Sequence, residues 1–128
     1  MRAVVDTSVI VNAWRQSGAT IDLITQAVLP LAVHAELLLG QQAARDAERE
    51  RERREVTYRL LRVEIIRPDQ ETAERWAKLK DHLRRRGRAL PHNDLWVAAA
   101  ALQLDLPLVS LDRHHQDLPG VVVLPERE

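Results

Sequence analysis

Four acidic residues interrupt or end largely apolar segments of this sequence, where a simple role on a solvated surface is least expected. They are Asp6, Glu36, Asp94 and Asp112. Grouped carboxylates repel one another unless a cation lies between them, and Mg²⁺ and Mn²⁺ prefer oxygen ligands. A bound divalent ion can polarise a phosphoryl group, activate a water molecule and stabilise a leaving oxygen. If the fold brings the four acids together, they could hydrolyse a phosphodiester bond with the help of a metal.

Asp6 and Asp112 each follow a short run of residues that is typical of a β-strand. Ligands of parallel α/β sheets bind beyond the carboxyl ends of the strands, so both acids are expected at that edge. Local alternatives exist, because Asp6 or Ser8 could cap the next helix and Asp112 could begin an Asx turn. We prefer Asp112 to Asp117 because strand alternation directs Ser110 and Asp112 to the same side.

Glu36 and Asp94 are expected near the beginnings of helices. Glu36 lies in an apolar run, and its alternative role is a place on the wet face of an amphipathic helix. Gly40 follows in the same run and predicts close backbone packing, because a glycine inside a helix costs about 1 kcal/mol relative to alanine. Asp94 opens a longer apolar helix for which Asn93 is the expected N-cap, so stabilising the helix start is its alternative role.

Strands and helices alternate along the chain, which predicts an α/β fold. Apolar runs rich in β-branched residues, bounded by Asp, Pro or Gly, are typical of strands buried on both faces. Residues 1–128 are therefore expected to form one domain, a three-layer sandwich around a central parallel sheet of about five strands. Segment 45–55 alternates acids and bases and predicts an exposed helix. The expected strands are residues 2–5, 29–33, 63–66, 108–110 and 121–124.

The amino-acid composition excludes some kinds of functional site. The 128 residues include no cysteine, which excludes disulfides and thiolate metal sites. Nineteen basic residues balance nineteen acidic ones, so the surface as a whole has no strong attraction for nucleic acid. We find no signal-peptide pattern and no apolar run near the ~20 residues that span a membrane. We therefore expect a cytoplasmic protein with no membrane partner.

A basic cluster lies near the middle of the chain and has two interpretations. Its arginines end a predicted helix, where positive charge complements the helix C-terminus. Guanidinium groups there could also bind RNA phosphates close to Asp94. The cluster consists of Arg84, Arg85, Arg86 and Arg88.

With these acids in place, the sequence resembles the PIN-domain ribonucleases, and most closely the VapC-type toxins of type II toxin–antitoxin systems, over nearly its whole length. Four motifs carry the resemblance, and all four acidic positions are filled. They are Val-Asp-Thr-Ser at 5–8, Ala-Glu-Leu with a following Gly at 35–40, Asn-Asp-Leu-Trp with a small-residue helix at 93–101, and Leu-Val-Ser-x-Asp-Arg-His at 108–114 with Pro-Gly at 119–120.

The resemblance implies a PIN-like sandwich, dependence on Mg²⁺ or Mn²⁺, a homodimer, and inhibition by a VapB-type antitoxin peptide that occupies the acidic groove. Substrates of the family are structured RNAs such as tRNA or ribosomal RNA. By carry-over, Asp6, Glu36, Asp94 and Asp112 coordinate metal and water. Ser8 and Ser110 match hydroxyl positions that orient the carboxylates or the metal-bound water.

Three departures from the family pattern remove no carboxylate. His115 stands where an aromatic residue is common, Val33 and His34 replace the usual hydroxyl residue, and phenylalanine is absent throughout. We interpret His115 as a packed or surface residue rather than an RNA-facing one, and leave it out of the predicted site.

Other functions fit less well. A phosphotransfer domain would also place an acid after its first strand, but no second aspartate lies two residues beyond Asp6 and no glycine-rich phosphate loop occurs. A non-catalytic RNA- or protein-binding module would not need four intact acids. A housekeeping RNA-processing nuclease of the same family remains the alternative to a toxin.

Overall fold

A computed structural model describes residues 1–16 and 19–126 of the chain. Its centre is a five-stranded sheet in the order β3-β2-β1-β4-β5, with every neighbouring pair parallel. The predicted α/β class with a parallel five-stranded sheet is confirmed. The strands are β1 (Arg2–Val5), β2 (Gln26–Pro30), β3 (Glu64–Ile66), β4 (Leu108–Val109) and β5 (Val123–Leu124).

Four of the five predicted strand ranges were wrong at one end or both. β3 begins at Glu64 rather than at residue 63, and β5 begins at Val123 rather than at residue 121. The other two differences have a local cause. The strand predicted at 29–33 runs from Gln26 to Pro30, and helix α2 begins at the next residue. Pro30 cannot donate a backbone hydrogen bond and ends the strand, so the apolar residues after it belong to the helix. The strand predicted at 108–110 ends at Val109, because the Ser110 side chain accepts the backbone N–H of Asp112 and turns the chain.

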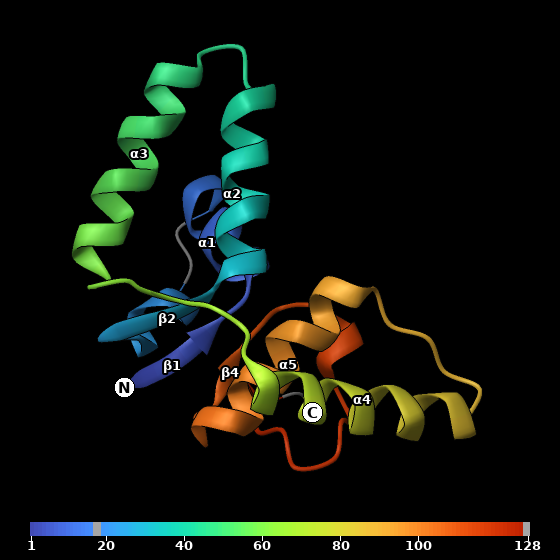
Figure 1. Cartoon of the computed structure of the whole chain (residues 1–128). Helices are drawn as coiled ribbons and strands as arrows, with labels where there is room; N and C mark the ends of the chain where they lie inside the picture. Colours follow the sequence, from blue (N-terminus) through green and yellow to red (C-terminus); the bar gives the residue numbers. More distant parts are fainter. Residues whose placement is uncertain (17–18, 127–128) are drawn as a thin grey trace.

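The helices and 3₁₀ turns of the described residues connect these strands. They are α1 (Thr7–Arg15), η1 (Ala19–Leu23), α2 (Leu31–Ala43), α3 (Ala47–Leu60), α4 (Gln70–Arg85), α5 (His92–Leu104) and η2 (Arg113–His115). The chain crosses the sheet from β1 through β2 to β3, and then returns to β4 and β5. Because parallel crossovers are right-handed, connections that run in opposite directions lie on opposite faces. Figure 1 shows α1, α2 and α3 grouped together, apart from α4 and α5.

Helix α5 lies between the sheet and α4, which explains why its sequence is apolar all round. Its Val97 and Ala101 join the core that the strands form, while Leu95 and Ala98 join a second core with residues of α4. A helix buried on two sides needs apolar groups around its circumference. The first turn of α5, which carries Asp94, is thereby fixed against the sheet.

Helices α2 and α3 form a hairpin that extends away from the sheet (Figure 1). No described residue of α3 is buried, and Arg51 and Arg53 pair with glutamates three or four residues away. The predicted exposed helix is therefore confirmed, with its start at Ala47. Trp14 of α1 supports the hairpin, because its Nε1 donates to Thr57 at 2.8 Å and the Arg53 guanidinium stacks on its ring.

Two local predictions about helices were also wrong. Asn93 is not an N-cap, because α5 already begins at His92 and Pro91 occupies the cap position with a φ of −54°. Proline fits there since its φ is preset and it has no N–H to leave unpaired. A Cβ added to Gly40 would meet no atom within 4 Å, so Gly40 does not mark close backbone packing. Among the described residues, no helix is long and apolar enough to cross a membrane.

Candidate active site

The candidate site lies where the direction of the chain across the sheet reverses. β1 is the strand from which the chain moves to β2 on one side, and β4 pairs with β1 on the other side. Ligands of open α/β sheets bind at the carboxyl ends of strands at such a switch point. Asp6 directly follows β1, and Ser110 directly follows β4. The sheet therefore brings together two of the segments singled out in the sequence.

Asp6 is a buried carboxylate held by two serine hydroxyls. Its side chain is almost inaccessible, and its Oδ2 accepts from Ser8 Oγ at 2.9 Å and from Ser110 Oγ at 3.0 Å. The same Ser8 oxygen accepts the backbone N–H of Leu111 at 3.0 Å. Asp6 occupies the N-cap position of α1 but makes no side-chain capping bond. Its side chain is thus used for the contact between the β1 and β4 ends.

Asp112 lies beyond the end of β4 and begins the turn η2. Its Oδ1 accepts the backbone N–H of His114 at 2.9 Å, which is the Asx turn considered as an alternative role. The Asp112 side chain is about one-third exposed, and it borders the same cleft as Asp94. Asp112 can therefore both begin the Asx turn and belong to the site. Asp117 is exposed in the following loop, with its backbone in the left-handed region.

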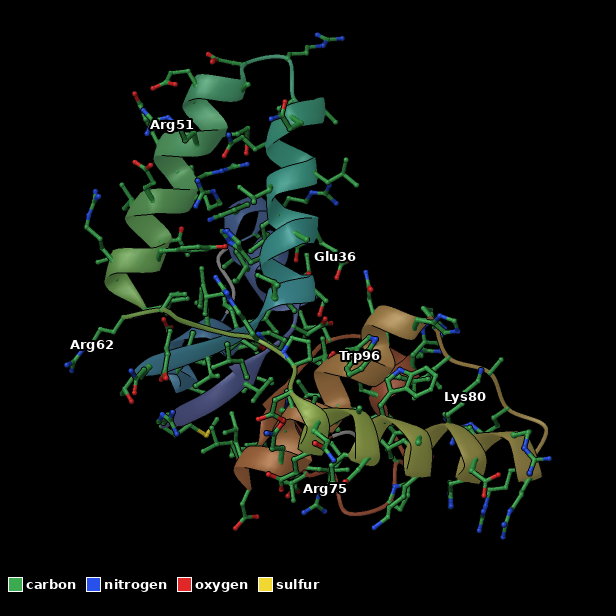
Figure 2. All side chains as sticks on the ribbon, viewed as in Figure 1. Glu36, Arg51, Arg62, Arg75, Lys80 and Trp96 are labelled. Carbon is green, nitrogen blue, oxygen red and sulfur yellow. The ribbon has the colours of Figure 1, made fainter. Side chains whose placement is uncertain are left out.

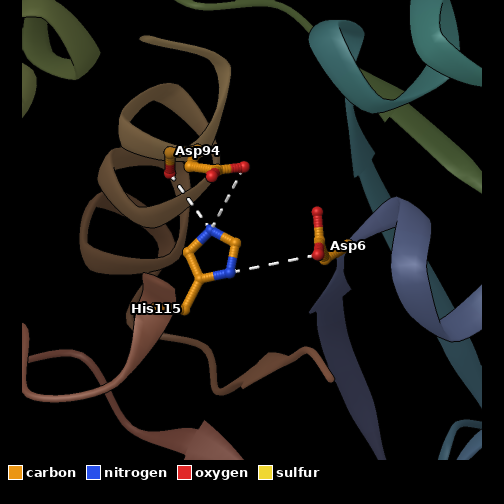
Figure 3. Close-up of side chains that lie close together, drawn as sticks. All are labelled: Asp6, Asp94 and His115. Carbon is orange, nitrogen blue, oxygen red and sulfur yellow. Dashed lines mark hydrogen bonds and ion pairs between the residues drawn. The ribbon is translucent and has the colours of Figure 1, made fainter. Parts of the chain in front are cut away.

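His115 lies between Asp6 and Asp94, as Figure 3 shows. The ring is fully buried, with Nδ1 at 2.9 Å from Ser110 Oγ and Nε2 at 3.3 Å from the Asp94 carbonyl oxygen. Each ring nitrogen also lies 3.9 Å from a carboxylate oxygen, Nδ1 from Asp6 and Nε2 from Asp94. The imidazole thus links the end of β1 to the first turn of α5.

Glu36 projects from the second turn of α2 on the side of α5 (Figure 2). It is exposed, as the wet-face alternative predicts, yet it lies at the rim of the cleft with Asp94 and Asp112. Thr7 Oγ1 donates to its Oε1 at 3.3 Å. Although much of the residue reaches solvent, partial desolvation of its carboxylate, followed by the negative charges of Asp6, Asp94 and Asp112, raises the pKa of Glu36 above its usual value. All four acids are therefore within electrostatic reach of one another.

The pKa of Asp94 is raised in the same way. Burial is the largest cause, the negative charges of Asp112 and Asp6 add to it, and the nearby His115 and His114 act in the opposite direction. A carboxylate surrounded by other carboxylates gains protons or binds a cation. The cluster is therefore electrostatically suited to a divalent ion.

Two groups of side chains among the described residues could each hold a metal ion. One comprises Asp6, Asp94 and His115, and the other comprises Asp94, Asp112 and His114, with candidate ligand atoms in each group within 4.8 Å of one another. Oxygen and imidazole ligands suit Mg²⁺, Mn²⁺ and other first-row divalent ions. The donor set fits a metal-dependent hydrolase.

The arginine cluster does not join these acids. Arg84 and Arg85 both pair with Asp81 on α4, at 2.7 and 3.0 Å. Arg86 contacts His82, and Arg88 donates to backbone carbonyls of residues 116 and 117. None of the four arginines lines the cleft that Glu36, Asp94 and Asp112 border. Their contacts agree with the helix-ending interpretation.

Sequence reasoning did not assign either histidine of η2 to the site, although both lie in candidate metal-holding groups. His115 was interpreted as a packed or surface residue and left out of the site; it is indeed packed, but the groups it packs against include Asp6 and Asp94. His114 was not singled out, although its Nδ1 lies near Asp94 and Asp112. A usable signal was their position, because they lie two and three residues after Asp112, in a turn that begins beyond a strand end.

Comparisons with known proteins agree with this geometry. The PIN domain family matches residues 3–121 of the chain. Ribonuclease VapC5 of Mycobacterium tuberculosis is 34% identical over 120 residues, which cover 91% of this chain and 87% of that protein. VapBC-5 from M. tuberculosis superposes with a TM-score of 0.73 and 26% identity, covering 95% of this chain and 96% of that chain.

A second solved structure shares the fold at lower sequence identity. VapBC2 from Rickettsia felis, bound to a DNA fragment from its promoter, superposes with a TM-score of 0.85 and 19% identity. The match covers 96% of this chain and 97% of that chain. The family match over most of the chain, with a full-length relative above 30% identity, shows that this chain belongs to the PIN-domain family.

Proposed function

We propose that this chain is a divalent-metal-dependent endoribonuclease, the toxin of a VapC-type toxin–antitoxin pair, that hydrolyses RNA phosphodiester bonds with Asp6, Glu36, Asp94 and Asp112. The observation that carries the proposal is the mutual electrostatic reach of these four carboxylates at the switch point of the sheet. Similarity to proteins named Ribonuclease VapC supports RNA as the substrate.

Each acid has a distinct place in the proposed site. Asp6 is the most fixed, because the bonds from Ser8 and Ser110 both go to its Oδ2. Asp94 and Asp112 both line the cleft and would hold Mg²⁺ or Mn²⁺ together with Asp6. Such an ion would activate water and neutralise charge on the phosphate. Glu36, which is exposed at the rim of the cleft and has a raised pKa, would orient that water and accept its proton.

The proposed partners follow from the relatives and from the charge of the cleft. Solved structures with this fold include VapBC and toxin–antitoxin complexes, which supports a VapB-type antitoxin for this chain. An antitoxin segment that places a cationic side chain among the acids would compensate their repulsion as a metal does. We further propose a homodimer and a tRNA or ribosomal RNA substrate, in keeping with the family.

RNA cleavage tests the proposed function directly. Purified, antitoxin-free protein should cleave pooled tRNA or ribosomal RNA in Mn²⁺ or Mg²⁺, and excess chelator should abolish the cleavage. Undiminished cleavage in chelator would overturn metal dependence. Expression of the native chain, but not of Asp6→Asn, should arrest bacterial growth. Cleavage in vitro without growth arrest would favour a housekeeping nuclease over a toxin.

A further inference from the structure

The side chain of His114 lies against two of the proposed metal-binding carboxylates. Its Nδ1 is 3.3 Å from Asp112 Oδ1 and 3.5 Å from Asp94 Oδ2. Oxygen and imidazole ligands lie about 2.1 Å from a first-row divalent ion, so neighbouring ligand atoms are roughly 3.0 Å apart in octahedral and 3.4 Å apart in tetrahedral coordination. The two distances are therefore close to those between ligands of one ion.

The backbone of η2 fixes the position of His114. Its N–H donates to Asp112 Oδ1 at 2.9 Å, and the next residue, His115, is fully buried and anchors the turn. The His114 side chain itself is 57% exposed and lines the open cleft with Glu36 and Asp94. A hydrated ion can reach its Nδ1 directly, which a buried ring would not allow.

His115 is less suited to be a ligand. Both of its ring nitrogens already have close partners, Ser110 Oγ and the Asp94 carbonyl oxygen. Its closest carboxylate contacts are longer, at 3.9 Å, and they involve different nitrogens of the ring. The two adjacent histidines thus have different surroundings: the His115 ring is held between the end of β4 and the first turn of α5, whereas the His114 ring is open to the cleft.

We propose that His114 Nδ1 is a direct ligand of the divalent ion, together with Asp94 and Asp112. The proposal rests on the proposed metal-dependent function and goes beyond its four carboxylates. Imidazole is a good ligand for Mn²⁺, Co²⁺ and Zn²⁺, whereas Mg²⁺ prefers oxygen. His114 therefore biases the site towards these transition-metal ions over Mg²⁺.

A plain ion pair is the competing explanation of the same contacts. If a charged His114 ring only neutralises the two carboxylates, it competes with the metal, and its removal should tighten metal binding. If the ring is a ligand, its removal should weaken metal binding. The two explanations thus predict changes of opposite sign in one measurement.

The experiment measures Co²⁺ and Mg²⁺ affinity by calorimetry for the full chain, His114→Ala, Asp94→Asn and the control His92→Ala. His92 lines the same cleft but its ring contacts Trp76 rather than a carboxylate. We expect His114→Ala to lose about tenfold or more in Co²⁺ affinity and clearly less in Mg²⁺ affinity, with His92→Ala unchanged. Addition of Zn²⁺ should also shift the ¹⁵N resonance of His114 Nδ1 in the native chain.

Unchanged or tighter Co²⁺ binding by folded His114→Ala would overturn the ligand role. If Asp94→Asn at the same time lost metal binding, the proposed function would stand without it. Absence of divalent-ion binding by the native chain, with RNA cleavage in chelator, would overturn both. Circular dichroism of each variant separates these outcomes from a failure to fold.

Discussion

The cleft at the end of β1 and the α2–α3 hairpin are both rich in charged residues, but their carboxylates have different neighbours. In the hairpin, Glu48 and Glu55 both pair with Arg51, and Glu50 pairs with Arg53. In the cleft, the neighbours of each acid include other acids, and the pKa of Glu36 and Asp94 is raised. Paired surface charges contribute little to stability, whereas gathered like charges cost stability and are retained for binding or catalysis.

Substitutions of acids in the two regions should differ most in their effect on the RNA cleavage rate. We expect Asp6→Asn and Asp94→Asn to lose at least about a hundredfold in cleavage rate, because each removes a proposed metal ligand from a preorganised site. Glu48→Gln in α3 should leave the rate unchanged. Initial rates at saturating Mn²⁺ would measure this, and a Glu48→Gln rate as low as that of the cleft variants would remove the distinction.

A second comparison separates two neighbouring aspartates. Asp112→Asn should lose cleavage activity by orders of magnitude, because Asp112 borders the cleft beside Asp94. Asp117→Asn is the matched control, since Asp117 is exposed with a φ of 60° and asparagine tolerates that conformation. Both folded variants would be assayed on the same RNA, and a greater loss in Asp117→Asn would refute the choice of Asp112.

His115 should affect the site through the acids that it positions. We expect His115→Phe to lose roughly ten- to a hundredfold in Mn²⁺ affinity, as is typical when a group that orients metal ligands is removed. His115→Gln keeps hydrogen-bonding groups and should recover part of the loss. Calorimetric titration alongside thermal unfolding would measure both effects. Equal Mn²⁺ affinity in the native chain and His115→Phe would show that the imidazole is only packed.

The smallest expected effect is on the melting temperature of the metal-free protein. Replacing a glutamate by glutamine should change it in opposite directions in the cleft and in the hairpin. The raised pKa of Glu36 means that the folded state binds its proton more tightly than the unfolded state, so stability falls as pH rises. Glu36→Gln should therefore raise the melting temperature at pH 7, and the gain should vanish below about pH 4, the pKa of an unfolded glutamate.

Glu48 in the hairpin should show the reverse. Its hydrogen bond from Arg51 lowers its pKa, so its ionised form favours folding above the unfolded pKa and Glu48→Gln should lower the melting temperature slightly. Melts of both variants in chelator at low ionic strength, across pH 3 to 8, would measure the pair. Destabilisation by Glu36→Gln at pH 7 would contradict the repulsion argument.

The sequence was most informative where local pattern and tertiary role coincide. Asp6 could be placed because it ends an apolar strand, and strand ends in parallel sheets share one edge. The apolar run after Asp94 predicted a buried helix, and α5 is buried between the sheet and α4. These inferences needed only periodicity and the position of an acid relative to a strand or helix.

The sequence was least informative where a single tertiary contact decides a role. His115 resembles many surface histidines in sequence, and only the approach of β1 and α5 makes it a link between Asp6 and Asp94. The start of α2 depended on Pro30, whose effect on a strand end competes with the apolar pattern that continues beyond it. The arginine cluster had two possible roles, of which the sequence favoured the helix-ending one, and its contacts with Asp81 and nearby backbone agree with that role.

The most direct test of the central claim, that the four acids form one divalent-metal site, is the melting temperature with and without Mn²⁺. Binding to the folded state alone stabilises it by about 2.7 kcal/mol at a hundredfold excess over the Kd. We expect Mn²⁺ to raise the melting temperature of the native chain and of Asp117→Asn equally, and that of Asp6→Asn and Asp94→Asn much less. Equal shifts in all four proteins would contradict a shared metal site.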